Sequence, residues 1–127
     1  MPTFVRVASH EGALAAPDAD VAVFSPAGEL GRAALEGLGD ELVGLACSAR
    51  PFAVRVVIDL GAVEHLDYRG LRPLAARKRL LASCGGGLWF AAPTAYVGAI
   101  LAAGPWQAWI PVAPSVEEAV RALTMPP

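Results

Sequence analysis

The chain has 127 residues, of which 55% are hydrophobic and 17% charged, and its formal net charge at pH 7 is −2. A chain of this length and composition can bury one hydrophobic core, so we expect a single domain over residues 1–127, with its core at about residues 3–124. The small negative charge argues against a nucleic acid partner, because binding to a phosphate backbone requires a surplus of Lys and Arg.

The sequence has no segment that predicts export or membrane insertion. The first part of the chain, residues 1–20, carries several charged side chains and lacks the uninterrupted apolar run of a secretory signal. The most apolar stretch, residues 96–113, is interrupted by Gly104 and Pro105 and falls short of the roughly 20 apolar residues of a transmembrane helix. We therefore expect a cytoplasmic protein without direct membrane insertion.

Two strands and one helix are expected in the first half. Residues 4–7 alternate apolar and polar side chains, and Val21–Phe24 is rich in strand-forming residues, so the two segments could pair antiparallel across the turn-rich segment 11–20. Leucines at helical spacing opposite acidic residues predict a helix over residues 33–47. Three glycines, Gly37, Gly39 and Gly44, are expected to weaken that helix.

In the second half, strands and helices alternate. We expect strands at 54–60, 88–91 and, as an edge strand, 109–112, and helices at 71–81, 95–103 after the cap Thr94, and 116–123 after the cap Ser115. Alternation of this kind favours a parallel sheet with right-handed crossovers. The predicted class is an α/β fold with a mixed sheet of four to five strands, mainly parallel, packed against about four helices.

The most specific pattern lies in residues 56–71. A buried strand is followed by a short connection, the acid Asp67, two further residues and then Gly70 and Leu71 at the start of a helix. The same chain carries, in order, Gly28-Glu29-Leu30 after the second strand, the triple glycine 85–87 before a strand, and the ending Pro114-Ser115-Val116-Glu117-Glu118-Ala119. In this combination the chain resembles the STAS domain family, and within it the bacterial anti-sigma factor antagonists.

The resemblance implies a non-catalytic domain that regulates by switching between protein partners. In antagonists of this family, a serine directly after the acid is phosphorylated by a kinase-like anti-sigma factor, and the phosphate breaks the complex. Tyr68 occupies that position here, and Arg69 follows it. Because a kinase site built for serine should reject tyrosine, we expect no phosphorylation at this position.

The expected partner surface lies around this segment. Pro73 is tolerated only in the first turn of a helix, so we expect the helix to begin at about residue 70 or 71, after an extended loop at 67–69 that points Tyr68 outward. Tyrosine and arginine are enriched in binding hot spots, whereas Asp67 could instead act as a helix N-cap. The predicted contact residues are Asp67, Tyr68, Arg69, Gly70, Arg72, Gly28 and Glu29.

Two further features allow two interpretations each. Half of the ten basic residues lie between positions 69 and 79, where they mark either a surface for an acidic partner or, as the patterning favours, a solvated helix face. Lys78 falls within the apolar arc of that helix, so its stem must pack there or meet an acid. Trp106 and Trp109 are expected to be core or half-buried anchors, with an exposed partner patch as the alternative.

No arrangement of Ser, His and Asp predicts catalysis, and His10 and His65 lie apart from other metal ligands, so we expect no enzyme, cofactor or metal site. The expected partner is a protein such as an anti-sigma factor or a kinase-like ATPase. Two alternatives stay open. One, implied by the resemblance, is an accessory subunit of a lipid-transporting ABC complex; the other is a flavodoxin-like domain that binds a small ligand near Asp59 and Ala91. The sequence leaves the oligomeric state open.

Overall fold

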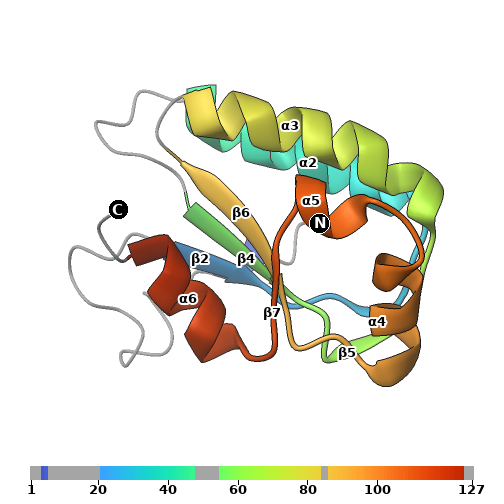
Figure 1. Cartoon of the computed structure of the whole chain (residues 1–127). Coiled ribbons are helices and arrows are strands. Elements are labelled where there is room, and N and C mark those ends of the chain that lie inside the picture. The colour runs from blue at the N-terminus through green and yellow to red at the C-terminus, as the bar shows by residue number, and fades with distance from the viewer. Residues whose placement is uncertain (1–3, 6–20, 48–54, 84–85, 125–127) are drawn as a thin grey trace.

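A computed structural model describes residues 4–5, 21–47, 55–83 and 86–124. Within these residues, five strands form one sheet in the order β1-β2-β4-β6-β7 (Figure 1). Strand β1 is antiparallel to β2, and all other neighbours are parallel, which confirms the predicted mixed sheet with a mainly parallel core. The strands are β1 (Phe4–Val5), β2 (Val21–Phe24), β4 (Arg55–Asp59), β6 (Gly87–Ala91) and β7 (Val112–Ala113).

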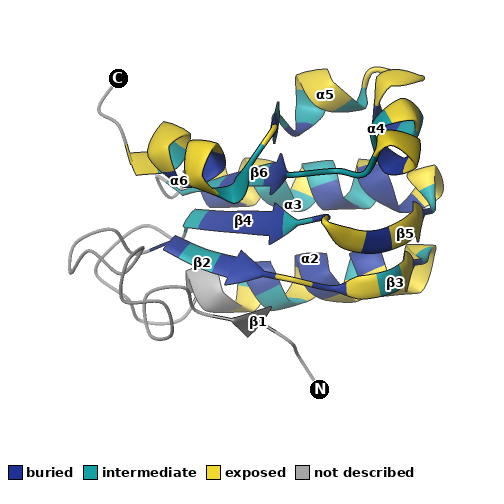
Figure 2. Ribbon diagram, turned by 90° about the horizontal axis from the view of Figure 1, so that it is seen from below, coloured by how far each residue is buried: buried dark blue, intermediate teal, exposed yellow. Residues whose placement is uncertain are grey.

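Helices cover both faces of this sheet. The long helices α2 (Arg32–Cys47) and α3 (Leu71–Ser83) lie side by side on one face, and α6 (Val116–Thr124) packs on the other (Figures 1 and 2). Helices α4 (Ala95–Ala102) and α5 (Trp106–Trp109) lie beyond the end of β6 and complete the five helices of the described chain. Among these residues, no helix has the length and apolar character needed to cross a membrane.

The sheet separates two hydrophobic clusters. On β4, Val56 and Ile58 are buried in the larger cluster beneath α2 and α3, whereas Val57 is buried in the smaller cluster beneath α6. Successive side chains of a strand point to opposite faces, so a central strand covered on both sides must be apolar throughout. This requirement explains the run Val56-Val57-Ile58 within β4.

A second, two-stranded parallel sheet was not predicted. Strand β3 (Ala27–Leu30) pairs with β5 (Ala62–Leu66), and the two continue beyond the ends of β2 and β4 (Figure 2). Both segments contain Ala, Gly or Glu, which have little intrinsic preference for strands. Burial of Leu30, Val63 and Leu66, which only the folded chain brings together, holds this small sheet in place.

The expected edge strand at residues 109–112 is wrong in its position. Trp109 ends helix α5, where the N–H of Ile110 donates to the carbonyl oxygen of Trp106 over 2.8 Å. Pro111 has no N–H, and its carbonyl oxygen accepts a bond from Phe90, so regular pairing begins only at Val112. The edge position itself is confirmed, because β7 is the last strand of the sheet.

The predicted helix caps are both present. Thr94 Oγ1 accepts a hydrogen bond from the N–H of Val97 at 3.2 Å, and Ser115 Oγ accepts one from Glu118 at 3.1 Å. Helix α3 begins at Leu71, as the position of Pro73 predicts. Residues 6–7, the turn-rich segment 11–20, His10, residue 54 and Gly85 lie outside the described residues.

Candidate functional site

A single helical turn, η1 (Tyr68–Gly70), connects β5 to α3 and holds the residues that the sequence singled out. The Asp67 carboxylate accepts the N–H of Arg69 at 2.9 Å, and the Asp67 carbonyl oxygen accepts the N–H of Gly70 at 3.0 Å. The Asp67 N–H in turn donates to Leu30 on β3 over 2.9 Å. The expected extended loop is therefore wrong, and the interpretation of Asp67 as an N-cap is confirmed, because its carboxylate folds the segment into a turn.

Asp67 also binds the side chain of Arg69 through two bonds. Arg69 Nε donates to Oδ1 at 3.0 Å and Arg69 Nη2 donates to Oδ2 at 2.8 Å, which is the bidentate geometry of a strong arginine–carboxylate pair. The side-chain bond, followed by the backbone bond, lowers the pKa of Asp67 from its ordinary 3.8 to about 2, and the same pair raises the pKa of Arg69. Because 66% of the Arg69 side chain is exposed, the turn presents a cation in a fixed orientation.

A titration tests this pair directly. By carbon-detected NMR, the Asp67 carboxyl group should titrate at about pH 2 in the native protein, and Arg69→Gln should move its pKa up toward 3.8 because the main stabilising bonds are lost. Since the pKa is lower in the folded state than in the unfolded chain, the pair stabilises the turn fully above about pH 4 and loses this effect as the pH falls through about 2. A native pKa near 3.8 would contradict the bidentate geometry.

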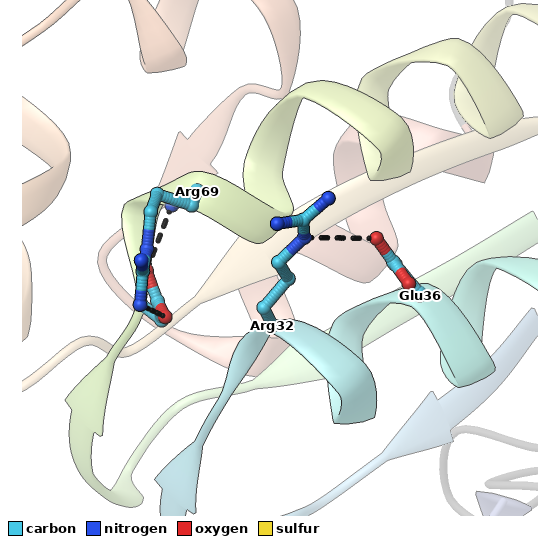
Figure 3. A network of polar contacts seen from close by, with 4 residues as sticks. Arg32, Glu36 and Arg69 are labelled. Atoms are coloured by element: carbon cyan, nitrogen blue, oxygen red, sulfur yellow. Dashed lines mark hydrogen bonds and ion pairs between the residues drawn. The ribbon is translucent and has the colours of Figure 1, made fainter.

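Gly70 places the turn directly on helix α2. A Cβ atom at this position would lie 2.7 Å from Leu35 Cδ1, 2.8 Å from Leu35 Cβ and 3.3 Å from Arg32 Cα, closer than side chains can approach without displacement. At this junction, Arg69 lies beside the first turn of α2, from which Arg32 projects to pair with Glu36 at 3.1 Å (Figure 3). The absence of a side chain at Gly70 thus sets the position of Tyr68 and Arg69 relative to the core.

Aromatic side chains surround the turn. Tyr68 is 55% exposed, and its ring centroid lies 6.0 Å from that of Trp106, which meets Trp109 edge-on at 5.1 Å. A second pair, His65 and Tyr96, stacks at 5.7 Å and shares a hydrogen bond of 3.1 Å between His65 Nδ1 and the Tyr96 hydroxyl. These separations are typical of favourable aromatic pairs. We call His65, Tyr68, Tyr96, Trp106 and Trp109 the aromatic strip.

A hollow of about 340 Å³ lies beside Tyr68 and the His65–Tyr96 pair. Its lining includes Tyr68, Tyr96 and both residues of the Asp67–Arg69 pair. Rigid aromatic rings around an oriented charge form the kind of surface that accepts a side chain of a binding partner. The residues that line the hollow are His65, Leu66, Asp67, Tyr68, Arg69, Tyr96 and Ile100.

The other predicted contact residues lie nearby, in two places. Arg72, in the first turn of α3, holds its guanidinium carbon 5.6 Å from the ring centroid of Trp109. Gly28 and Glu29 lie on β3, where Glu29 is opposite His65 of β5, and Gly28 takes a left-handed φ of +78° at an irregularity of the pairing. The structure therefore places these two residues beside the strand that leads into the turn.

Sequence reasoning missed Tyr96 and the pairing of His65 with it. Tyr96 follows the cap Thr94 by two residues, and this exposed first-turn position was a local signal for a surface aromatic. Trp106 and Trp109 are half-buried against the core, which confirms the expectation for them, and both are also part of the aromatic strip. Their contribution to a common surface depends on the fold of α5.

Near Asp59 and Ala91, where the alternative ligand site was expected, local hydrogen bonds engage one carboxylate oxygen and one carbonyl oxygen. Asp59 Oδ1 accepts the N–H of Gly61 at 2.9 Å, and the Ala91 carbonyl oxygen accepts the N–H of Leu60 at 2.8 Å. Within the residues that the structure describes, no group of three or more His, Cys, Asp and Glu side chains could hold a metal ion.

Comparisons with known proteins agree on the fold. TM1081 of Thermotoga maritima, described as a candidate anti-sigma factor antagonist, superposes with a TM-score of 0.65 at 18% identity over 84% of this chain and 89% of that one. The anti-sigma factor antagonist SpoIIAA in its unphosphorylated form gives a TM-score of 0.65 at 20% identity over 81% of this chain and 87% of that one.

The same fold occurs within a larger protein. Part of the murine anion transporter Slc26a9, equal to 18% of its chain, superposes on 82% of this chain with a TM-score of 0.64 at 17% identity. No curated protein matches the sequence. The family model for the STAS domain matches residues 15–119, which include the Gly28–Glu29 strand, the Asp67 turn and the first turn of α6. The chain therefore belongs to the STAS domain family.

Proposed function

We propose that this protein is a single regulatory domain that binds a protein partner and catalyses no reaction. Its contact residues are Asp67, Tyr68, Arg69, Gly70, Arg72, Gly28 and Glu29. The observation that carries the proposal is the exposure of Tyr68 on the turn η1. Asp67 caps this turn, and the lack of a side chain at Gly70 lets it pack against α2. A rigid, exposed tyrosine next to an oriented arginine has the composition of a binding hot spot.

The binding mode resembles that of an anti-sigma factor antagonist that lacks the phosphorylation switch. Tyr68 takes the place of the family's serine, and its ring rests against Trp106 instead of offering a short hydroxyl next to the backbone. Arg69 follows it, so neither position carries a serine or threonine. The partner, an anti-sigma factor or a kinase-like ATPase, would then be released through changes in concentration, a ligand or another site.

The proposal is tested by affinity capture from the native host, followed by calorimetry with the purified partner. Tyr68→Ala and Arg69→Ala should each weaken binding at least tenfold, as expected for hot-spot residues that contribute about 2 kcal/mol or more. Leu80→Ala and Arg121→Ala are the matched controls, because both side chains are exposed on other parts of the surface, on α3 and α6. Their affinities should equal that of the unmodified protein.

Other outcomes overturn the proposal in distinguishable ways. Equal binding by all four variants would place the partner surface elsewhere, and mass spectrometry that finds phosphate on Tyr68 of the native protein would restore a phosphorylation switch. Recovery of a membrane transport ATPase would support the role in lipid transport. A small molecule retained by the purified protein, in the absence of a protein partner, would support the flavodoxin-like alternative.

A further inference from the structure

Helix α3 has an unusual distribution of charge. Its thirteen residues include Arg72, Arg77, Lys78 and Arg79 but no Asp or Glu. Arg77 extends to α2 and pairs with Asp40 at 3.1 Å. The other three cations have no carboxylate partner among the described residues, in contrast to the alternating charges of an ordinary solvated helix.

These unpaired cations lie around a groove between α3 and α5. Two hollows of about 350 and 240 Å³ adjoin there, and both are lined by Ala75, Arg79 and Trp109. Helix α5 lies alongside α3 at this place (Figure 1), so that Trp109 forms one wall of the groove. We call this site, lined also by Arg72, Ala76, Lys78, Ala82 and Ala108, the α3–α5 groove.

The spacing along α3 places two small side chains between two cationic ones. Arg72, Ala75, Ala76 and Arg79 follow the pattern i, i+3, i+4, i+7 and so share one face of the helix. Seven residues of helix rise about 10 Å, which is the separation of the two arginine positions along the axis. Alanine side chains between them leave room for the backbone of a bound segment.

The remaining side chains add a flat apolar surface and a third charge. Arg72 rests on the face of Trp109, and Trp106 meets Trp109 edge-on, so the indole is held in place. Lys78, which the sequence placed within the apolar arc of α3, is half-buried and lines the smaller hollow. Among the described residues that line either hollow, there is no Asp or Glu.

We propose that the α3–α5 groove binds an acidic segment of a partner protein, with two carboxylates about 10 Å apart that pair with Arg72 and Arg79. In a polyproline II segment, which has three residues per turn and rises about 3.1 Å per residue, acids three residues apart lie about 9 Å apart on the same side, and an apolar side chain between them packs on Trp109. The inference rests on the proposed function and names the chemistry of the partner. The net charge of −2 argues against a nucleic acid as the ligand. A flat membrane surface could not reach the alanines at the base of the groove.

The test uses a synthetic peptide, acetyl-Gly-Glu-Leu-Ala-Glu-Leu-Gly-amide, and an analogue with lysine in place of both glutamates. In NMR spectra of the ¹⁵N-labelled protein, the acidic peptide should shift the Ala75 and Ala76 amides and the Trp109 indole N–H, and the lysine analogue should not. The double variant Arg72→Gln/Arg79→Gln should weaken binding at least tenfold. Arg121→Gln, with its exposed side chain on α6, should leave the affinity unchanged.

Several results would overturn the inference. These are an absence of shifts at millimolar peptide, equal binding of the lysine analogue, shifts confined to another face, and binding of phosphatidylglycerol vesicles or an oligonucleotide in place of the peptide. The outcome is separable from that of the proposed function, because the peptide assay requires no native partner. If Tyr68→Ala abolishes capture of the partner while the double glutamine variant captures it fully, the groove proposal and the assignment of Arg72 as a contact residue fail, whereas the proposed partner surface at Tyr68 stands.

Discussion

Replacement of Leu81 by alanine is expected to lower the free energy of unfolding by about 3 kcal/mol, because it removes a fully buried side chain and leaves a cavity in the core. Leu81 lies on the face of α3 that packs against the sheet, in the same cluster as Leu71 and Leu74. A loss of this size is a large part of the roughly 5–15 kcal/mol that stabilises a domain. Urea denaturation followed by circular dichroism measures it.

The adjacent residue provides a matched control. Leu80 is 50% exposed, whereas Leu81 is completely buried, and both belong to the same turn of α3. Leu80→Ala makes the same chemical change with the same effect on helix propensity, and it should alter stability by no more than about 0.5 kcal/mol. Equal losses for the two variants would show that α3 is rotated from the orientation described here.

A second large effect is expected at Gly70. Gly70→Ala should destabilise the protein by about 2 kcal/mol, because the new methyl group would overlap Leu35, which is fully buried and cannot move freely. The overlap is with Leu35 Cβ as well as with the end of its side chain, so a change of rotamer does not relieve it. Relaxation would displace η1 from α2, and partner binding through Tyr68 should weaken as well.

Gly37→Ala should have the opposite sign. Gly37 lies on the same helix as Leu35, and a Cβ atom built there meets nothing within 4 Å. Alanine in a helix is favoured over glycine by about 0.5–1 kcal/mol, so this variant should be more stable than the unmodified protein. Chemical denaturation of both variants under identical conditions compares them, and stability changes of the same sign and size in both would contradict a specific overlap at Gly70.

The glycines of α2 show the difference between local and tertiary information. By propensity, Gly37, Gly39 and Gly44 all weaken the helix. In the folded protein, however, Gly39 is buried at the contact with α3, where a Cβ atom would lie 2.7 Å from Arg77 Cγ. Arg77 passes over this position to reach Asp40 on the same helix. Sequence alone does not distinguish Gly39 from its neighbours, because the atom that requires the space lies on another helix.

The candidate site was only partly predictable, again because some of its contacts come from other elements of the fold. The order of its residues along the chain marked Asp67, Tyr68 and Arg69, but the bond from the Asp67 N–H to Leu30 of β3 joins segments that only the folded chain brings together. Tyr96 and Trp106 join the surface from α4 and α5, and no periodicity in the sequence relates them to Tyr68.

The sequence by itself determined the features that depend on neighbours along the chain. These are the apolar arcs of α2 and α3, the two-sided burial of β4, the caps Thr94 and Ser115, and the start of α3 before Pro73. Only the tertiary structure decided the pairing of β3 with β5, the seat of Gly70 on α2, the aromatic strip and the groove beside Trp109. Local geometry follows from backbone sterics and periodic burial, whereas a surface built from separate elements exists only once packing has brought them together.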